Sequence, residues 1–229
     1  MSFVSISYFG HSAVCINTAD DKQILIDPFI STNPLCPKPL PQFSNLSAIC
    51  LTHAHADHVG DTLKLATEST ATVCATYELA ALLAKDGVKS ENLEFMNKGG
   101  SVKIDGASVT LTQAFHSSSY GEAAGLIIKL DSGQTIYHAG DTMVFSDMQL
   151  IAQRYKPDIA FLPIGDRFTM GPKEAVDAAK LLAVDRVIPI HFGTFDALTG
   201  TTDEFCSELK GTNIEAIVLE PGSSLKLEA

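Results

Sequence analysis

Short apolar runs recur along the whole chain, and this pattern limits the fold more than any other feature. The first three runs, at 4–9, 13–17 and 23–27, are typical of an antiparallel meander because turn residues separate them. Further strands are expected at 48–52, 71–75, 102–104, 108–114, 126–130, 135–138, 159–163, 187–190 and 214–219. Helical patterns follow strands in both halves of the chain. The sequence therefore predicts an α+β protein in which two sheets pack face to face and the helices lie outside them.

Three segments between the strands carry their own signals. Ser146 to Gln149 and Thr201 to Glu204 each place a hydroxyl residue three positions before Gln or Glu, which is the capping-box pattern of a helix N-terminus. The proline-rich segment at 28–41 can sustain neither a helix nor a strand ladder. We expect it to form an ordered loop over one edge of the protein.

The composition is that of one globular domain spanning 1–229. Hydrophobic residues make up 45% of the chain and charged residues 19%, with no sign of disorder. The apolar runs are too short for a membrane span, and the start of the chain lacks the pattern of a secretory signal. Five cysteines without a CxxC pair disfavour a disulfide framework, so we expect a cytoplasmic protein with no membrane partner. The net charge of −11 argues against a nucleic-acid partner.

The strongest chemical signal is a run of four candidate metal ligands that follows an apolar strand and precedes a helical pattern. His53 and His55 point to the same side of an extended backbone, and Asp57 and His58 follow where the chain turns. The chain has seven histidines, and a solvated surface turn has no need for three of them beside a carboxylate. Imidazole and carboxylate suit zinc, manganese or iron, so ligand type alone does not choose the metal.

Three more candidate ligands stand at the ends of predicted strands. His116 follows the strand at 108–114, Asp141 follows the strand at 135–138, and His191 ends the strand at 187–190. Loops at strand ends gather into functional sites. A purely structural role is the alternative for each of these residues alone. All three stand at strand ends in a chain that also carries the run at 53–58, and this combination favours metal ligation.

Several segments together resemble those of a known family. The chain is similar to the hydrolases of the metallo-β-lactamase fold, and most of all to a group of metal-dependent hydrolases related to ascorbate-6-phosphate lactonase. The His-Ala-His-Ala-Asp-His run at 53–58 is specific for the superfamily. The segments typical of the group are Gly10-His11-Ser12, Asp27-Pro28-Phe29, Gln113–His116, Tyr137–Thr142, Leu162–Pro172 and Ile188–Phe195.

This resemblance implies a four-layer αββα sandwich with two divalent metal ions at one edge, between the sheets. The family pattern places one ion on His53, His55 and His116. It places the second ion on Asp57, His58 and His191, with Asp141 bridging both ions. Zinc is the expected metal, and manganese, nickel and iron are the alternatives.

Two adjacent cations lower the pKa of a shared water and so supply hydroxide at neutral pH. We expect this hydroxide, oriented with the help of Asp57, to attack an ester, lactone, amide or phosphoester of a small molecule. His11 and His138 are candidates for protonating the leaving group, because imidazole titrates near neutrality. A structural hydrogen bond is the alternative for both. Asp27 and Thr52 are candidates for holding ligand rings in one tautomer, with ordinary strand-end packing as the alternative.

The substrate is not named by the sequence. Arg167, near the helix that follows Pro172, is a candidate for receiving an anionic substrate group. Candidate apolar walls, for which core packing is the alternative, are Phe29, Phe168, Phe192 and Phe195. A homo-oligomer is compatible with the resemblance, because relatives of this fold often associate.

Other activities remain open at this stage. An iron-dependent oxygenase is the main alternative because the same fold hosts such enzymes, although oxygen reductases usually carry glutamate where this chain has His55. A metallo-nuclease is disfavoured by the acidity of the chain and by the lack of an added nucleic-acid-binding domain. A non-catalytic metal-binding protein is the last alternative, and the intact ligand set argues against it.

Overall fold

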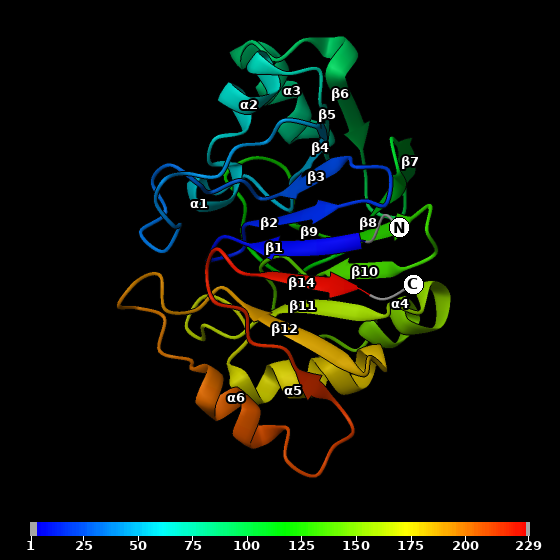
Figure 1. Cartoon of the computed structure of the whole chain (residues 1–229). Helices are drawn as coiled ribbons and strands as arrows, with labels where there is room; N and C mark the ends of the chain where they lie inside the picture. Colours follow the sequence, from blue (N-terminus) through cyan, green and yellow to red (C-terminus); the bar gives the residue numbers. More distant parts are fainter. Residues whose placement is uncertain (1–3, 228–229) are drawn as a thin grey trace.

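Two seven-stranded sheets form the centre of the fold in a computed structural model that describes residues 4–227 (Figure 1). The first sheet consists of β1 (Val4–Tyr8), β2 (Val14–Asn17), β3 (Gln23–Ile26), β4 (Leu46–Cys50), β5 (Thr72–Thr76), β6 (Leu93–Met96) and β14 (Ser224–Leu227). The second consists of β7 (Ser101–Ile104), β8 (Ala107–Gln113), β9 (Ala124–Leu130), β10 (Thr135–His138), β11 (Ile159–Pro163), β12 (Arg186–Ile190) and β13 (Glu215–Ala216). The helices are α1 (Ala56–Val59), α2 (Thr62–Glu68), α3 (Tyr77–Asp86), the 3₁₀ helix η1 (Ser90–Asn92), α4 (Met148–Tyr155), α5 (Pro172–Leu182) and α6 (Thr202–Glu208).

Each sheet is antiparallel in one part and parallel in the other. The first sheet has the order β14-β1-β2-β3-β4-β5-β6, and its pairs are parallel from β3 to β6. The second has the order β13-β12-β11-β10-β9-β8-β7, and its pairs are parallel from β10 to β13. The parallel pair β3 and β4 is joined by the long loop at 27–45, and the other parallel pairs are joined through helical segments. The predicted opening meander corresponds to the antiparallel β1, β2 and β3.

The core between the sheets follows from the two-residue period of the strands. Val4, Ile6 and Tyr8 in β1 are buried, whereas Ser5 and Ser7 between them are only half-buried. The facing strands of the second sheet contribute the same kind of apolar side chains to this core, from Val109 to Ile188. Side chains at every second position lie on one face of a strand, so this alternation directs the apolar face of β1 inward.

Helices cover the outer faces of both sheets and complete four layers. Leu79 and Leu83 of α3 pack on the outer face of the first sheet. Ala179 and Leu182 of α5 pack on the outer face of the second sheet, together with side chains of α4 and α6. Figure 1 shows α2 and α3 beside β4 to β6, and α5 and α6 beside β12. The predicted α+β, αββα sandwich is confirmed.

Several local predictions were wrong or incomplete. Strands β6 and β14 were not predicted, because Leu93–Met96 lacks β-branched residues and the alternating run Ser224–Leu227 is only four residues long. The strand expected at 214–219 is only two residues long. The capping box at Ser146 does not form, since α4 begins at Met148 without a side-chain cap. At Thr201 the capping hydroxyl does accept a hydrogen bond from the N–H of Glu204, at 3.2 Å.

The proline-rich segment is an ordered loop that packs beside the turn between β1 and β2. The buried side chain of Asn33 donates hydrogen bonds to the carbonyls of Phe9, Gly10 and Phe29 at 3.1–3.2 Å. One amide therefore ties this loop to the segment that carries His11. Within residues 4–227, no helix has the length and apolarity needed to cross a membrane.

Candidate metal centre

The predicted ligands come together at one end of the sandwich because each follows the carboxyl end of a strand. His53 and His55 lie just after β4, and Asp57 and His58 lie in α1. His116, Asp141 and His191 follow β8, β10 and β12, respectively. Segments far apart in the sequence thus deliver all seven side chains to one place.

Asp141 lies at the middle of this cluster. Its Oδ2 atom is 3.0 Å from Nε2 of His191, 3.4 Å from Nε2 of His58 and 3.5 Å from Nε2 of His116. The corresponding distance to Nε2 of His53 is 4.0 Å. One carboxylate therefore faces four histidines from three separate segments of the chain.

The side chains form two groups of candidate ligands, and Asp141 lies close to members of both. His53, His55 and His116 have ligand atoms within 4.8 Å of one another. Asp57, His58 and His191 form a second such group, which also includes His11. The two groups match the predicted division between two ions, with His11 as an addition. Their binding of metal stays a prediction.

Buried polar atoms without partners test whether a cation fits this place. Among residues 4–227, Nε2 of His58 and Oδ1 of Asp141 are buried and have no hydrogen-bond partner. A buried polar atom left unsatisfied costs about 1–3 kcal/mol. Both atoms are good ligands for a divalent cation, and both lie in the cluster. The residues present therefore fit a metal site.

Asp27 and Thr52 orient the ligand rings from behind. Oδ2 of the fully buried Asp27 accepts hydrogen bonds from Nδ1 of His58 and from the hydroxyl of Thr52, both at 2.7 Å. Its Oδ1 accepts from the N–H of Thr52 at 2.9 Å. The Thr52 hydroxyl also lies 3.0 Å from Nδ1 of His53. These contacts keep the hydrogen of each ring on Nδ1, so that Nε2 is left free to bind a metal.

Gly140 makes this packing sterically feasible. Its φ of +61° belongs to the left-handed region, and a Cβ there would lie 2.8 Å from the Cβ of Thr52. Any other residue would push Thr52 away from Asp27 or strain the backbone that carries Asp141.

The two histidines predicted as proton donors lie in different surroundings. Nε2 of His11 is 3.1 Å from Oδ2 of Asp57, and its Nδ1 is 2.9 Å from the hydroxyl of Thr194. His138 is fully buried, and its two ring nitrogens contact the carbonyl of Ser12 and the N–H of Gly140 at 3.2 Å. The structure thus brings His11 to the ligands and engages His138 with the backbone. Thr194 was missed by the sequence analysis, because only the folded chain places it beside His11.

Burial and neighbouring charges set the protonation of the cluster. Among the protein groups alone, burial lowers the pKa of His11 to about 4 and that of His53 to about 3. Burial also lowers the pKa of His58, but nearby carboxylates outweigh it and the net pKa is raised. Burial raises the pKa of Asp57 and Asp141, whereas neighbouring histidines lower it more, so both carboxylates are charged at pH 7. Charged carboxylates and neutral imidazoles are the forms that bind metals, so His58 must release a proton when an ion binds.

A hollow of about 210 Å³ opens over the cluster. Its polar floor includes His55, Asp57 and Asp141, and the aromatic rings of Phe168 and Phe195 line it as well. Both rings are exposed, at 53% and 42% of their surface. Phe29, by contrast, is buried.

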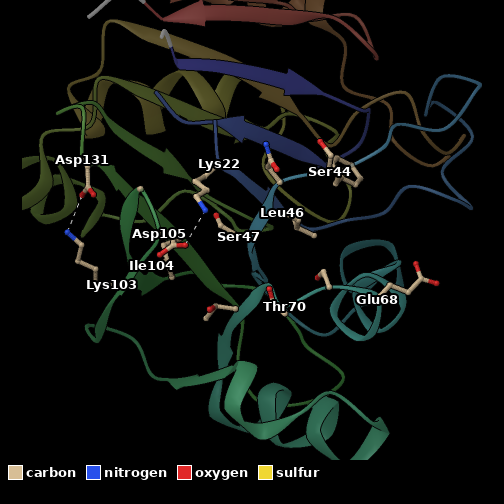
Figure 2. Close-up of a pocket in the computed structure, with 15 residues that line it drawn as sticks. Lys22, Ser44, Leu46, Ser47, Glu68, Thr70, Lys103, Ile104, Asp105 and Asp131 are labelled. Carbon is tan, nitrogen blue, oxygen red and sulfur yellow. Dashed lines mark hydrogen bonds and ion pairs between the residues drawn. The ribbon is translucent and has the colours of Figure 1, made fainter. Parts of the chain in front are cut away.

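A larger hollow of about 750 Å³ lies elsewhere and lacks these features. Figure 2 shows Lys22 reaching toward Asp105 and Lys103 toward Asp131, at 3.5 and 3.4 Å. These four charged side chains thus pair with one another at the surface. The histidine cluster is therefore the better candidate site.

The chain is similar to known proteins in both sequence and structure. Residues 22–192 match the family described as the beta-lactamase superfamily domain. A UPF0173 metal-dependent hydrolase of Rubrobacter xylanophilus is 43% identical over 232 residues, which cover 96% of this chain and 95% of the relative. A protein of the same name from Anoxybacillus flavithermus is 45% identical over 234 residues, which cover 98% of this chain and 100% of the relative.

A solved structure agrees with these relatives. Igni18, a metallo hydrolase from the hyperthermophilic archaeon Ignicoccus hospitalis, superposes with a TM-score of 0.88 at 35% identity. The alignment covers 99% of both chains.

Proposed function

The chain belongs to the beta-lactamase superfamily and is a metal-dependent hydrolase of the metallo-β-lactamase fold, and from this premise we propose that it holds two adjacent divalent ions and hydrolyses a small molecule. His53, His55 and His116 hold the first ion, and Asp57, His58 and His191 hold the second. Asp141 is shared between them.

The position of Asp141 is the observation that carries this proposal. Its Oδ2 atom lies within 3.5 Å of Nε2 atoms from His58, His116 and His191. His116 belongs to one ligand group and the other two belong to the second. A single carboxylate close to members of both ligand groups supports a bridging role.

Divalent ions bound there would lower the pKa of a water molecule and act as Lewis acids toward the scissile group. The protein contributes position and charge. Asp57 is partly exposed at the floor of the hollow, with 29% of its side chain accessible, so its carboxylate can orient a water next to the substrate. Asp27 and Thr52 keep the ligand rings in the tautomers that bind metal.

The hollow favours a small substrate with an apolar part. Ligand pockets for drug-sized molecules usually measure about 300–1,000 Å³, so a hollow of about 210 Å³ suits a smaller molecule. Phe168 and Phe195 offer apolar contacts beside the floor of the site. The guanidinium of Arg167 lies over the ring of Phe168, 5.6 Å from its centroid. We therefore include an anionic group on the substrate in the proposal. The proposed scissile bond is an ester, lactone, amide or phosphoester.

Metal analysis followed by activity profiling tests this function. Protein purified without added metal should contain two ions per chain by elemental analysis, and it should cleave members of a panel of small esters, lactones and phosphodiesters. Asp141→Ala should lose at least one ion and all turnover, whereas Asp177→Ala, at an exposed position of α5, should behave as the wild type. Unchanged single-turnover activity in Asp141→Ala would contradict the bridging role. Full metal loading without turnover of any substrate would favour a non-catalytic protein.

A further inference from the structure

His11 occupies an unusual backbone position beside the metal ligands. It lies in the turn between β1 and β2 with a φ of +59°, a conformation that residues other than glycine rarely adopt, and it is fully buried. Its carbonyl accepts hydrogen bonds from the N–H of His191 at 2.7 Å and from the hydroxyl of Tyr8 at 3.1 Å. The strained turn is therefore fixed on two sides, and one of its contacts is the backbone of a candidate ligand. Strained residues of this kind often cluster at functional sites.

The side chain of His11 joins a second candidate ligand to a distant loop. Nε2 lies 3.1 Å from Oδ2 of Asp57, and Nδ1 lies 2.9 Å from the hydroxyl of Thr194. A charged carboxylate can only accept, so Nε2 must donate its hydrogen to Asp57. In the neutral ring Nδ1 then accepts the hydrogen of the Thr194 hydroxyl. The chain of hydrogen bonds thus runs from Thr194 through His11 to Asp57.

Asp57 needs such a partner. It sits in a helix of only four residues, at the partly exposed floor of the hollow. Within residues 4–227, the one side-chain hydrogen bond to its carboxylate comes from His11. Ligating carboxylates are usually held by hydrogen bonds from residues behind them, and the loss of such a partner weakens metal binding.

We propose that His11 is the positioning residue of the second metal site, holding Asp57 through its ring and His191 through its carbonyl, with Thr194 setting the orientation of the ring. This inference rests on the proposed two-metal function. It assigns His11 a role different from protonation of a leaving group, because the Nε2 hydrogen is directed at Asp57.

Variants of the two linked residues test the proposal. His11→Ala removes the ring, and His11→Gln replaces it with an amide that can still donate to Asp57. Thr194→Val keeps the imidazole and removes only the hydroxyl. Thr67→Val, which removes an exposed hydroxyl on α2, serves as the matched control.

The readout is the affinity of each ion, measured by titration against a competing chelator. His11→Ala should weaken the second ion about 10–100-fold and leave the first unchanged, which is the usual effect of losing a residue that supports a ligand. His11→Gln should restore most of the affinity, Thr194→Val should show a smaller loss, and Thr67→Val should show none. Because Thr194 acts through His11, Thr194→Val combined with His11→Ala should be no worse than His11→Ala alone.

Three results separate the explanations. Wild-type affinity for both ions in His11→Ala would overturn the proposal. A cobalt-substituted His11→Gln protein with an altered ligand-field spectrum would also overturn it, because His11 would then be a ligand itself. Wild-type protein that binds one ion would contradict the two-metal function. If His11→Ala does not fold, Thr194→Val takes its place. A loss of second-ion affinity in Thr194→Val then supports the proposal, and wild-type affinity overturns it.

Discussion

Replacing Asp27 with asparagine should weaken the binding of the second ion while leaving the fold intact. The carboxylate is fully buried and accepts three hydrogen bonds, from Nδ1 of His58 and from the hydroxyl and N–H of Thr52. Asparagine has the same shape but only one acceptor oxygen. If that oxygen keeps the Thr52 N–H, the NH₂ group faces Nδ1 of His58, and two donors then oppose each other.

The size of the loss in metal affinity depends on which hydrogen-bond donors lose their acceptor in Asp27→Asn. Nδ1 of His53, 3.0 Å away, offers the Thr52 hydroxyl no new acceptor, because it carries a hydrogen itself when Nε2 of His53 binds a metal. The same holds for His58, whose Nδ1 hydrogen would face the NH₂ group of the new asparagine. One buried unsatisfied donor costs about 1–3 kcal/mol. Supporting residues of this kind typically contribute about 10–100-fold to metal affinity, which is about 1.4–2.8 kcal/mol.

Chelator competition measures this loss directly. Asp27→Asn should show a second-ion affinity reduced about 10–100-fold and a first-ion affinity close to that of the wild type. Asp158→Asn is the control, because the Asp158 carboxylate also accepts a backbone N–H, at 2.7 Å from Thr135, but lies at the amino end of β11, opposite to the end that carries the ligands. Affinities within twofold of the wild type for Asp27→Asn would refute the role assigned to the Asp27–His58 contact.

Three further outcomes are expected. In metal-free protein the folded-state pKa values of His11 and His53, about 4 and about 3, lie below the unfolded value of about 6.5. At these two residues the unfolded chain therefore binds more protons in this window, and the unfolding free energy should fall as the pH is lowered from 6.5 to 4.5, with the raised pKa of His58 offsetting part of the fall. Urea titrations that show constant stability there would count against these shifts. Phe161→Ala should cost about 3–5 kcal/mol in chemical unfolding, because Phe161 is fully buried between the sheets. Phe168→Ala should raise KM more than it changes kcat for substrates with an apolar group and should leave thermal stability unchanged, and an equal loss on a purely polar substrate would argue against an apolar wall.

The sequence predicted the parts of the site that depend on local order. Four ligands lie within six residues of sequence, so the strand end and the turn after it are enough to direct their side chains to one place. They are His53, His55, Asp57 and His58. His116, Asp141 and His191 could be proposed because each follows a recognisable apolar strand. The likeness to a known family then supplied the division between two ions. The family and the sandwich are confirmed by the comparisons and the fold.

What depends on distant contacts could not be predicted. The hydrogen bond between His11 and Thr194 joins residues 183 positions apart, and no spacing rule connects them. His138 shares a segment with Asp141, yet its ring points to the backbone of Ser12 instead of the ligands. The edge strand Leu93–Met96 forms because β5 offers it a parallel partner, although its own residues give a weak strand signal.

The pairing of β1 with β14 has a consequence for the order in which the molecule is built. The hydroxyl groups of Ser7 and Ser224 share a hydrogen bond of 2.8 Å across 217 positions of sequence. Contacts of such long range slow folding, because the entropy of closing the loop is lost before the contact is gained. During synthesis, β1 must wait with one edge unpaired until β14 has left the ribosome. A nascent chain of this protein should therefore bind chaperones that shield exposed strand edges.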